Sequence, residues 1–296
     1  MNRMTNISFL GTGLLGSAFV EAAIKRGDVV TVWNRTAEKA RALEPLGARV
    51  AKSPAEAVRG AARVHLVLKD DAVVEDVIAA LRPGLDAKTI IVDHTTTQPA
   101  LTAKRAQRLG REGVRYLHCP VFIGPEAARR EKGTILASGP KALFDAVEPA
   151  LKRMAEKVDY LGERPDLAAV YKLCGNAFII GINALVADVL SVASGAHVDA
   201  TAALRVVEMF NPAATIAGRG KSMAARQFDP TFELVMARKD VRLMIETAGP
   251  LPLSTLPGIA ERMDALISEG LGDKDLAVMG RDAVTPTAPP AARSVR

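Results

Sequence analysis

The chain has 296 residues, of which 49% are hydrophobic and 24% are charged, and its formal net charge is +6. This composition is typical of a globular protein and excludes a disordered or fibrous chain. The basic residues are scattered rather than gathered into a run with interleaved aromatic residues, so we expect no nucleic-acid partner. Cys119 and Cys174 lie far apart and lack metal-ligand spacing, which indicates no zinc site, no disulfide framework and a reduced, cytoplasmic setting.

The first half of the chain alternates short β-rich runs with helical segments. Such regular alternation predicts a mainly parallel sheet with helices on both faces, the Rossmann type of α/β domain. Strands are predicted at 6–11, 29–34, 48–51, 64–69 and 89–96, and helices at 14–27, 36–47, 53–61 and 71–84. Further strands are predicted at 114–121, 134–139 and 157–162.

From Pro165 onward the strand signals vanish and the chain reads as helical. We therefore predict a dinucleotide-binding domain over 1–163 and an all-α domain over 164–282 that serves the substrate and the oligomer. The tail 283–296 is rich in proline and alanine and is predicted to be disordered. The apolar run 173–196 is almost long enough to span a membrane, but Asn176, Asn183 and Asp188 interrupt it. A buried or oligomer-facing helix, in a homodimer or homotetramer with no membrane partner, is the preferred interpretation.

The stretch GTGLLG follows the first predicted strand and opens the first predicted helix. In a dinucleotide-binding loop of this spacing, the glycines allow a tight turn, a close approach of the backbone to a pyrophosphate, and close helix-strand packing. The helix N-terminus adds N–H groups and partial positive charge. A glycine turn without a ligand is the alternative, but strand, spacing and helix agree. The predicted phosphate-binding residues are Gly11, Thr12, Gly13, Leu14, Leu15 and Gly16.

The end of the second predicted strand bears on the choice of cofactor. NAD-specific sites usually place an acid there for the ribose 2′-hydroxyl, whereas this chain has Asn34, Arg35 and Thr36. A cation with hydrogen-bonding neighbours suits the 2′-phosphate of NADP, although Arg35 is alternatively a solvated loop residue. At the ends of later strands, Leu68, Lys69 and Thr96 also lie where a dinucleotide is expected.

An apolar run over 170–190, VYKLCGNAFIIGINALVADVL, contains a single lysine, Lys172, with Asn176 one helical turn later. A lysine in such a helix is costly unless its ammonium is paired, hydrated or used. In carbonyl reduction it can protonate, or hydrogen-bond to, the oxygen on which negative charge develops. The alternative is a side chain that lays its stem on apolar surface and keeps its charge in water. Of the histidines, His94 alone lies near the expected nicotinamide end.

Several ordered segments, from FLGTGLLGSAFV through VDHTTTQP and CPVFIGPEAARREKGTILASG to YKLCGNAFIIGINALVADVL, FELVMARKDVRLM and EGLGDKDLAVM, carry a resemblance. The chain resembles the β-hydroxyacid dehydrogenase family, which includes 3-hydroxyisobutyrate dehydrogenases, tartronate semialdehyde reductases and glyoxylate/succinic semialdehyde reductases and is related to 6-phosphogluconate dehydrogenase. The resemblance implies a Rossmann domain followed by a helical oligomer-forming domain. It implies that Lys172 is the catalytic lysine with Asn176 as its companion. It also implies that Thr96 and Lys239 contact the cofactor and that Asp240 is a supporting carboxylate in the substrate site.

The chain departs from the family pattern in the substrate loop and around the lysine. Where the family has a serine–glycine–glycine run that binds the substrate carboxylate, this sequence has Phe122, Ile123 and Gly124 in a longer loop. Gly175 stands where an asparagine is common. The loss of the serine hydroxyl removes one ligand of a carboxylate, so a carboxylate-bearing substrate is in doubt.

Taken together, the residues predict an NADPH-preferring dehydrogenase or reductase of the class that acts on CH–OH donors. Its substrate is expected to be a small aldehyde or ketone of the semialdehyde or β-hydroxyacid type, with Lys172 as general acid and base. An imine reductase-like enzyme is one alternative, favoured by the altered loop and disfavoured by Lys172. A non-catalytic NADP-binding regulatory protein is the other.

Overall fold

The computed structural model describes residues 5–284, which divide by their contacts into two compact units, 5–177 and 178–284. The division falls inside helix α8 (Leu167–Gly195), because the first turn of this helix packs on the sheet-bearing unit, where Ala168 and Ala169 are buried. The domain boundary at 163/164, inferred from composition, lies just before this helix and stays a prediction.

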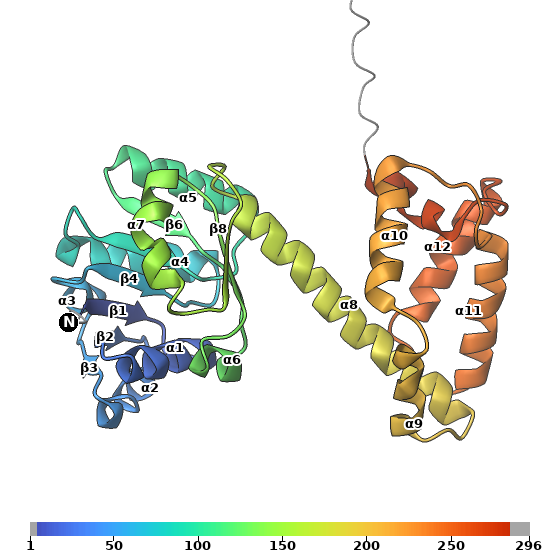
Figure 1. The fold of residues 1–296 in the computed structure, drawn as a ribbon, viewed down its shortest axis with the longest axis horizontal. Coiled ribbons are helices and arrows are strands. Elements are labelled where there is room, and N and C mark those ends of the chain that lie inside the picture. Colours follow the sequence, from blue (N-terminus) through green and yellow to red (C-terminus); the bar gives the residue numbers. More distant parts are fainter. Residues whose placement is uncertain (1–4, 285–296) are drawn as a thin grey trace, which may run out of the picture. The chain divides into compact units, whose positions relative to one another are not determined.

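Within the described residues, unit 1 is built on a six-stranded parallel sheet of order β3-β2-β1-β4-β5-β6 (Figure 1). From β1 the chain adds β2 and β3 on one side, and it then crosses to add β4, β5 and β6 on the other side. This switch point between β1 and β4 leaves a crevice at the carboxyl ends of the strands. The Rossmann prediction is therefore confirmed. The strands are β1 (Asn6–Leu10), β2 (Val29–Trp33), β3 (Arg49–Val50), β4 (Arg63–Leu66), β5 (Ile90–Asp93) and β6 (Arg115–His118). The connecting helices are α1 (Leu14–Lys25), α2 (Ala37–Arg41), α3 (Pro54–Val58), α4 (Asp71–Leu81) and α5 (Pro99–Arg111).

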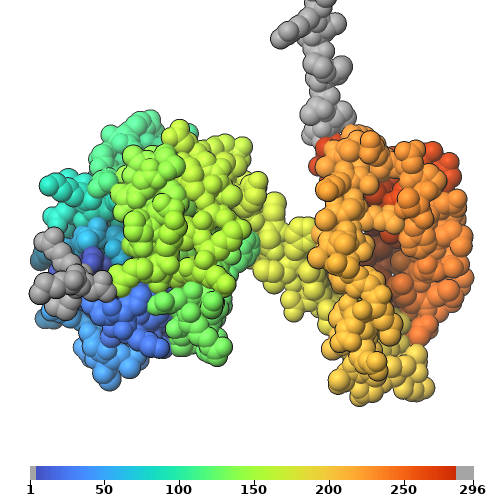
Figure 2. Space-filling model, in the orientation of Figure 1, coloured from blue at the N-terminus to red at the C-terminus, as the bar shows by residue number. Residues whose placement is uncertain are grey.

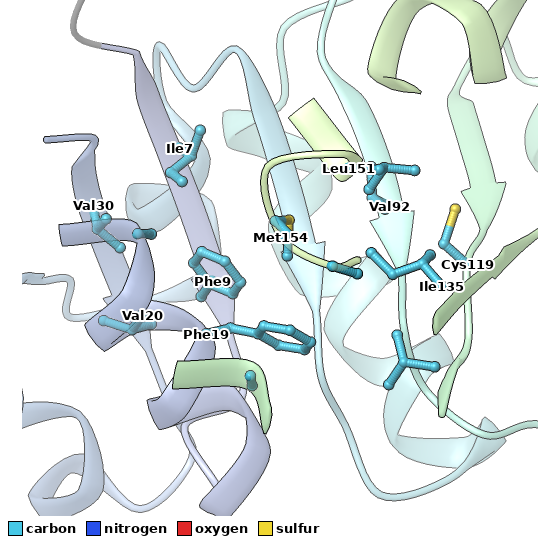
Figure 3. Packing of buried hydrophobic residues seen from close by; sticks show 14 of the residues in the cluster. Ile7, Phe9, Phe19, Val20, Val30, Val92, Cys119, Ile135, Leu151 and Met154 are labelled. Carbon is cyan, nitrogen blue, oxygen red and sulfur yellow. The ribbon is translucent and has the colours of Figure 1, made fainter. Parts of the chain in front are cut away.

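Each face of this sheet carries its own hydrophobic core, because successive strand residues point to opposite faces. Phe9 packs with helix α1 on one face, and its ring centroid lies 6.4 Å from that of Phe19 (Figure 3). Leu10, the next residue, packs on the other face with helices α3, α4 and α5. Helices on both faces explain why the strands read as nearly continuous apolar runs.

A second, three-stranded sheet follows, formed by β7 (Val121–Phe122), β8 (Thr134–Ala137) and β9 (Lys157–Tyr160) with helices α6 (Pro125–Arg129) and α7 (Lys141–Leu151). The single strand predicted over 114–121 is wrong. Its first part is β6 in the large sheet, and β7 begins the small one after Cys119 and Pro120. Proline lacks the N–H that would continue a strand ladder, so the chain changes sheets at this point.

In unit 2 the described residues are helical, and this part of the fold prediction is confirmed. Helices α9 (Ala200–Leu204), α10 (Pro212–Ala225), α11 (Leu234–Ala248) and α12 (Leu256–Ser268) precede a 3₁₀ helix over Leu276–Ala283. Leu234, Met263 and Leu266 lie at the centre of its core, and α10 lies at the surface of the unit (Figure 2). The predicted disordered tail falls, beyond its first two residues, outside the described residues.

Helix α8 is apolar but little buried by the chain itself. An 18-residue stretch of it has a mean hydropathy of 1.9, and 6% of that stretch is buried; by length and composition alone the helix could cross a membrane. Phe178 and Ile180 are 56% and 68% exposed. The interpretation of α8 as an oligomer-facing helix stays a prediction.

Candidate functional site

A cavity of about 800 Å³ opens at the carboxyl ends of β1, β2, β4 and β5, within unit 1. This edge is where doubly wound sheets bind their ligands. The cavity brings together most of the residues predicted to form the site: Gly11, Gly13, Leu14, Leu15, Gly16, Asn34, Arg35, Thr36, Leu68, Lys69, Thr96, Ile123 and Lys172.

The glycine loop fits a dinucleotide phosphate in its geometry. Gly11 has φ of 100°, and a Cβ there would lie 2.2 Å from the Val67 carbonyl oxygen. A Cβ on Gly16 would lie 2.0 Å from the Gly11 oxygen, whereas one on Gly13 would meet no described atom within 4 Å. Helix α1 begins directly after Gly13, and no described side chain caps it. The free N–H groups of its first turn therefore face open space that an anionic phosphate would suit.

Asn34 braces this loop. Its Oδ1 accepts a hydrogen bond from the Thr12 N–H at 3.0 Å, and its Nδ2 donates to the Thr36 carbonyl oxygen at 2.9 Å. The amide thus ties the end of β2 to the phosphate loop. The Thr12 Oγ1 atom is buried and has no hydrogen-bond partner among the described residues. Asn34 therefore positions the loop, a role that the sequence alone did not indicate.

Two cations stand together at the end of β2. Arg35 and Lys39 both line the cavity, and Lys39 lies one helical turn further along the chain in α2. In the part of the chain that the structure describes, neither forms an ion pair with a carboxylate, whereas the neighbouring Arg41 pairs with Glu38 at 3.7 Å. Unpaired cations of this kind suit a phosphate. Lys39 was not among the predicted site residues, although its i+4 spacing from Arg35 is a usable signal.

The ends of β4 and β5 are held together by Thr95. Its Oγ1 accepts a hydrogen bond from the Leu68 N–H at 3.1 Å, and its own N–H donates to Asp93 Oδ1 at 2.9 Å. Thr96, the next residue, is exposed and lines the cavity. The Lys69 side chain is 83% exposed and lies 3.9 Å from Asp70.

A directional hydrogen-bonded chain runs through the buried histidines. Arg63 Nε donates to His65 Nε2 at 3.1 Å, and because guanidinium nitrogens only donate, His65 carries its proton on Nδ1. His65 Nδ1 then donates to His94 Nε2 at 2.9 Å, and His94 Nδ1 donates to the Cys119 carbonyl oxygen at 2.7 Å. Burial lowers the pKa of His94 to about 4 and holds the pKa of His65 well below its ordinary value.

His94 lines the cavity, yet both of its ring nitrogens are engaged in this chain. It is neutral at physiological pH and is not free to act as a proton donor. Within residues 5–284, no three His, Cys, Asp or Glu side chains are grouped so that they could hold a metal ion.

Lys172 lies at the cavity wall with its ammonium half-buried. Its Nζ donates to Asn176 Oδ1 at 2.9 Å and lies 4.3 Å from the centroid of the Phe122 ring. Among residues 5–284, no carboxylate lies within ion-pair distance of it, so an amide oxygen and an aromatic face hold the charge. Burial lowers the pKa of the Lys172 ammonium below its ordinary value of 10.5.

Of the other predicted residues in unit 1, Thr12, Phe122, Gly124 and Asn176 do not line the cavity. Gly124 precedes the first turn of α6. Lys239 and Asp240 belong to unit 2, on α11, where Lys239 Nζ lies 2.8 Å from Asp240 Oδ1. Their roles at cofactor and substrate stay predictions. Arg129 and Arg130, in the long loop after β7, pair with Glu21 at 2.7 Å and Glu126 at 2.5 Å on the surface.

Comparison with known families accounts for both halves of the chain. Residues 6–162 match the NAD-binding domain of 6-phosphogluconate dehydrogenase, and residues 167–281 match the NAD-binding domain of NADP-dependent 3-hydroxyisobutyrate dehydrogenase. The fold and these matches define an NAD(P)-binding oxidoreductase. The chain belongs to the 3-hydroxyisobutyrate dehydrogenase family, and the resemblance seen in its sequence is confirmed.

Individual relatives differ in what their names describe. Glyoxylate/succinic semialdehyde reductase 1 of Arabidopsis thaliana is 30% identical over 92% of this chain and 96% of its own. The cytokine-like nuclear factor N-PAC of Homo sapiens is 29% identical over 81% of this chain and 44% of its own length. An imine reductase from Myxococcus stipitatus, solved with NADP⁺, has a TM-score of 0.84 at 18% identity, covering 93% of this chain and 99% of that one. At this identity the last likeness concerns the fold.

Proposed function

We propose that the protein is an NADPH-preferring reductase that transfers a hydride to the carbonyl carbon of a small aldehyde or ketone. One observation carries the proposal. Lys172 places a half-buried ammonium with no carboxylate partner among residues 5–284 at the wall of the same cavity that holds the glycine loop. A lysine so placed is available to a substrate oxygen. The semialdehyde reductase relative supports a carbonyl substrate.

Lys172 and Asn176 have different roles at the reacting carbonyl. NADPH, when bound, supplies the hydride, and the protein contributes alignment and charge. Lys172 donates an N–H to the carbonyl oxygen as negative charge develops there, and then its proton. Asn176 holds one N–H of the ammonium, which fixes the direction of the others. Because burial lowers the pKa of Lys172, its proton is transferred more readily than that of a solvated lysine.

The preference for NADPH over NADH rests on Arg35 and Lys39. The end of β2 carries no acid that would hold a ribose 2′-hydroxyl and repel a phosphate. Two cations without carboxylate partners among the described residues line the cavity there instead, and each can pair with the 2′-phosphate.

The direct test is a screen of aldehydes, keto acids and cyclic imines, followed by the loss of NADPH absorbance. Turnover of aldehydes or ketones is the expected result. Turnover of cyclic imines alone would replace carbonyl reduction by imine reduction, which the loss of the loop serine at Phe122 also allows. No turnover of any compound, with NADPH still bound, would favour the non-catalytic alternative.

We also propose that the chain assembles, at least as a homodimer, in the cytoplasm. Large apolar side chains are exposed along α8, and a contiguous apolar surface of this kind marks an interface. A protein partner fits better than lipid, because Asp188, on the same helix, is 1% exposed and its carboxylate accepts hydrogen bonds from the Ser254 and Leu256 N–H groups. A second copy of the chain is the partner that we propose.

A further inference from the structure

Two residues that depart from the family pattern, Phe122 and Gly175, are in contact. A Cβ on Gly175 would lie 2.2 Å from Phe122 Cζ and 2.7 Å from Phe122 Cε1. The far edge of the phenyl ring therefore occupies the space that any other side chain at position 175 would need. The two departures form one packing arrangement rather than two independent changes.

The same ring lies against the Lys172 ammonium. The distance of 4.3 Å from Lys172 Nζ to the Phe122 centroid is that of a cation–π contact, in which the electron-rich face of the ring meets the positive charge. That face repels an anion, and phenylalanine offers no donor to a carboxylate. Ile123, the next residue, lines the cavity with an apolar side chain.

The basic side chains between β7 and β8 are already paired. Arg129, Arg130 and Lys132 lie within ion-pair distance of Glu21, Glu126 and Glu156. A carboxylate beside Phe122 would thus meet an apolar ring and gain no side-chain hydrogen bond from this loop. If it paired with Lys172 instead, it would occupy the ammonium that the carbonyl oxygen needs.

We propose that Phe122 determines the substrate class: the site takes a carbonyl compound with uncharged, apolar groups next to the reacting carbon and discriminates against one that carries a carboxylate. The inference rests on the proposed carbonyl reduction. Gly175 is part of the same determinant, because it makes room for the ring over Lys172.

The test compares 4-oxobutanoate with its methyl ester, two aldehydes that differ in one charge. With NADPH, kcat/KM for the ester should exceed that for the carboxylate by about tenfold or more, the size of a lost polar pairing. Phe122→Ser should shrink this ratio by about tenfold, because it restores a hydroxyl and removes the ring face. The dissociation constant of NADPH should stay within about threefold of the wild-type value, which checks that the variant is folded.

A second variant displaces the Phe122 ring without replacing the residue. Gly175→Ala should push the Phe122 ring off Lys172 and move the ratio in the same direction, and it should add nothing in the Phe122→Ser background. Gly110→Ala on α5, where a Cβ would meet no described atom within 4 Å, is the matched control and should leave the ratio unchanged.

The outcomes separate the two proposals. A wild-type enzyme that reduces the carboxylate as well as the ester, or a ratio that Phe122→Ser leaves unchanged, overturns the role of Phe122 while carbonyl reduction stands. If Phe122→Ser changes the ester-to-carboxylate ratio and Gly175→Ala does not, the position of the ring over Lys172 does not determine the substrate class. Oxidation of NADPH by neither aldehyde, nor by any other carbonyl compound, overturns the proposed function and this inference with it.

Discussion

The Asn176 side-chain oxygen accepts a hydrogen bond from Lys172 Nζ at 2.9 Å, one helical turn away on α8. The i to i+4 spacing puts both side chains on one face of the helix, so the contact needs no distortion. With the Phe122 ring on the ammonium as well, the lysine keeps only part of its hydrogen-bonding capacity free. That part lies at the cavity wall.

Removal of the Asn176 acceptor should impair the lysine. In Asn176→Ala we expect kcat to fall by about tenfold or more, because the donor loses its direction. The alkaline limb of the pH profile lies below 10.5 in the wild type, since burial lowers the pKa of Lys172, and should move lower still once an acceptor that favours the charged form is lost. Profiles of kcat/KM for both proteins measure this. The control is Asn183→Ala on the same helix, where the Asn183 amide bonds the Ile179 carbonyl oxygen. A profile of Asn176→Ala that coincides with this control would contradict the pairing.

The cofactor preference should depend on Arg35 and Lys39. Lys39→Ala should raise KM for NADPH by about tenfold and leave KM for NADH nearly unchanged, since only NADPH carries the 2′-phosphate. Arg35→Asp should go further and shift the preference toward NADH, because a carboxylate there repels the phosphate and accepts from the ribose hydroxyl. Arg41→Ala, which removes an exposed arginine paired with Glu38, is the control. If the ratio of KM for NADPH to KM for NADH were the same in Arg35→Asp as in the wild type, this account would be refuted.

The buried histidines should make the fold sensitive to acid. Their folded-state pKa values lie below those of the unfolded chain, so the unfolded chain binds more protons below pH 6.5 and stability is lost as the pH falls toward about 4. His94 alone accounts for about 3 kcal/mol of this loss. Denaturant midpoints across this window should fall less steeply in His94→Asn than in the wild type. His197→Asn, at an exposed left-handed position that asparagine tolerates, should parallel the wild type. A flat wild-type midpoint over this window would count against buried neutral histidines.

Assembly through α8 should be visible in the native mass. We expect light scattering to give at least twice the chain mass of 31.3 kDa. Ile180→Lys should reduce it to that of the monomer, because Ile180 is 68% exposed in the chain and a lysine would be buried unpaired in the interface. Leu46→Lys, which alters an exposed leucine of the 3₁₀ helix over Glu44–Leu46, is the control and should leave the mass unchanged. A monomeric wild type would contradict assembly through α8.

The parts of the fold that the sequence predicted are those encoded locally. The six residues GTGLLG are enough to predict the phosphate-binding loop, and the periodicity of apolar residues is enough to predict the alternation of strands and helices. The split of 114–121 between two sheets was missed, because strand periodicity does not say which sheet a strand joins. Proline at position 120 was the available signal.

The missed parts of the site are tertiary contacts. Asn34 braces Thr12 across 22 residues, and His65 bonds His94 across 29, and no pattern along the chain reports such pairs. Phe122 and Gly175 appeared in the sequence as two unrelated departures, and only the geometry joins them. Lys172 and Asn176 stood out early because one helical turn brings them together.

The central claim is that the Lys172 ammonium serves the reacting oxygen, and one substitution tests it. Lys172→Met keeps an apolar stem of similar length and removes the charge and the proton. With a carbonyl substrate that the wild type reduces, we predict that kcat/KM falls by about a hundredfold or more while the NADPH dissociation constant stays within about threefold. A Lys172→Met enzyme that reduces the substrate at the wild-type rate would contradict the mechanism.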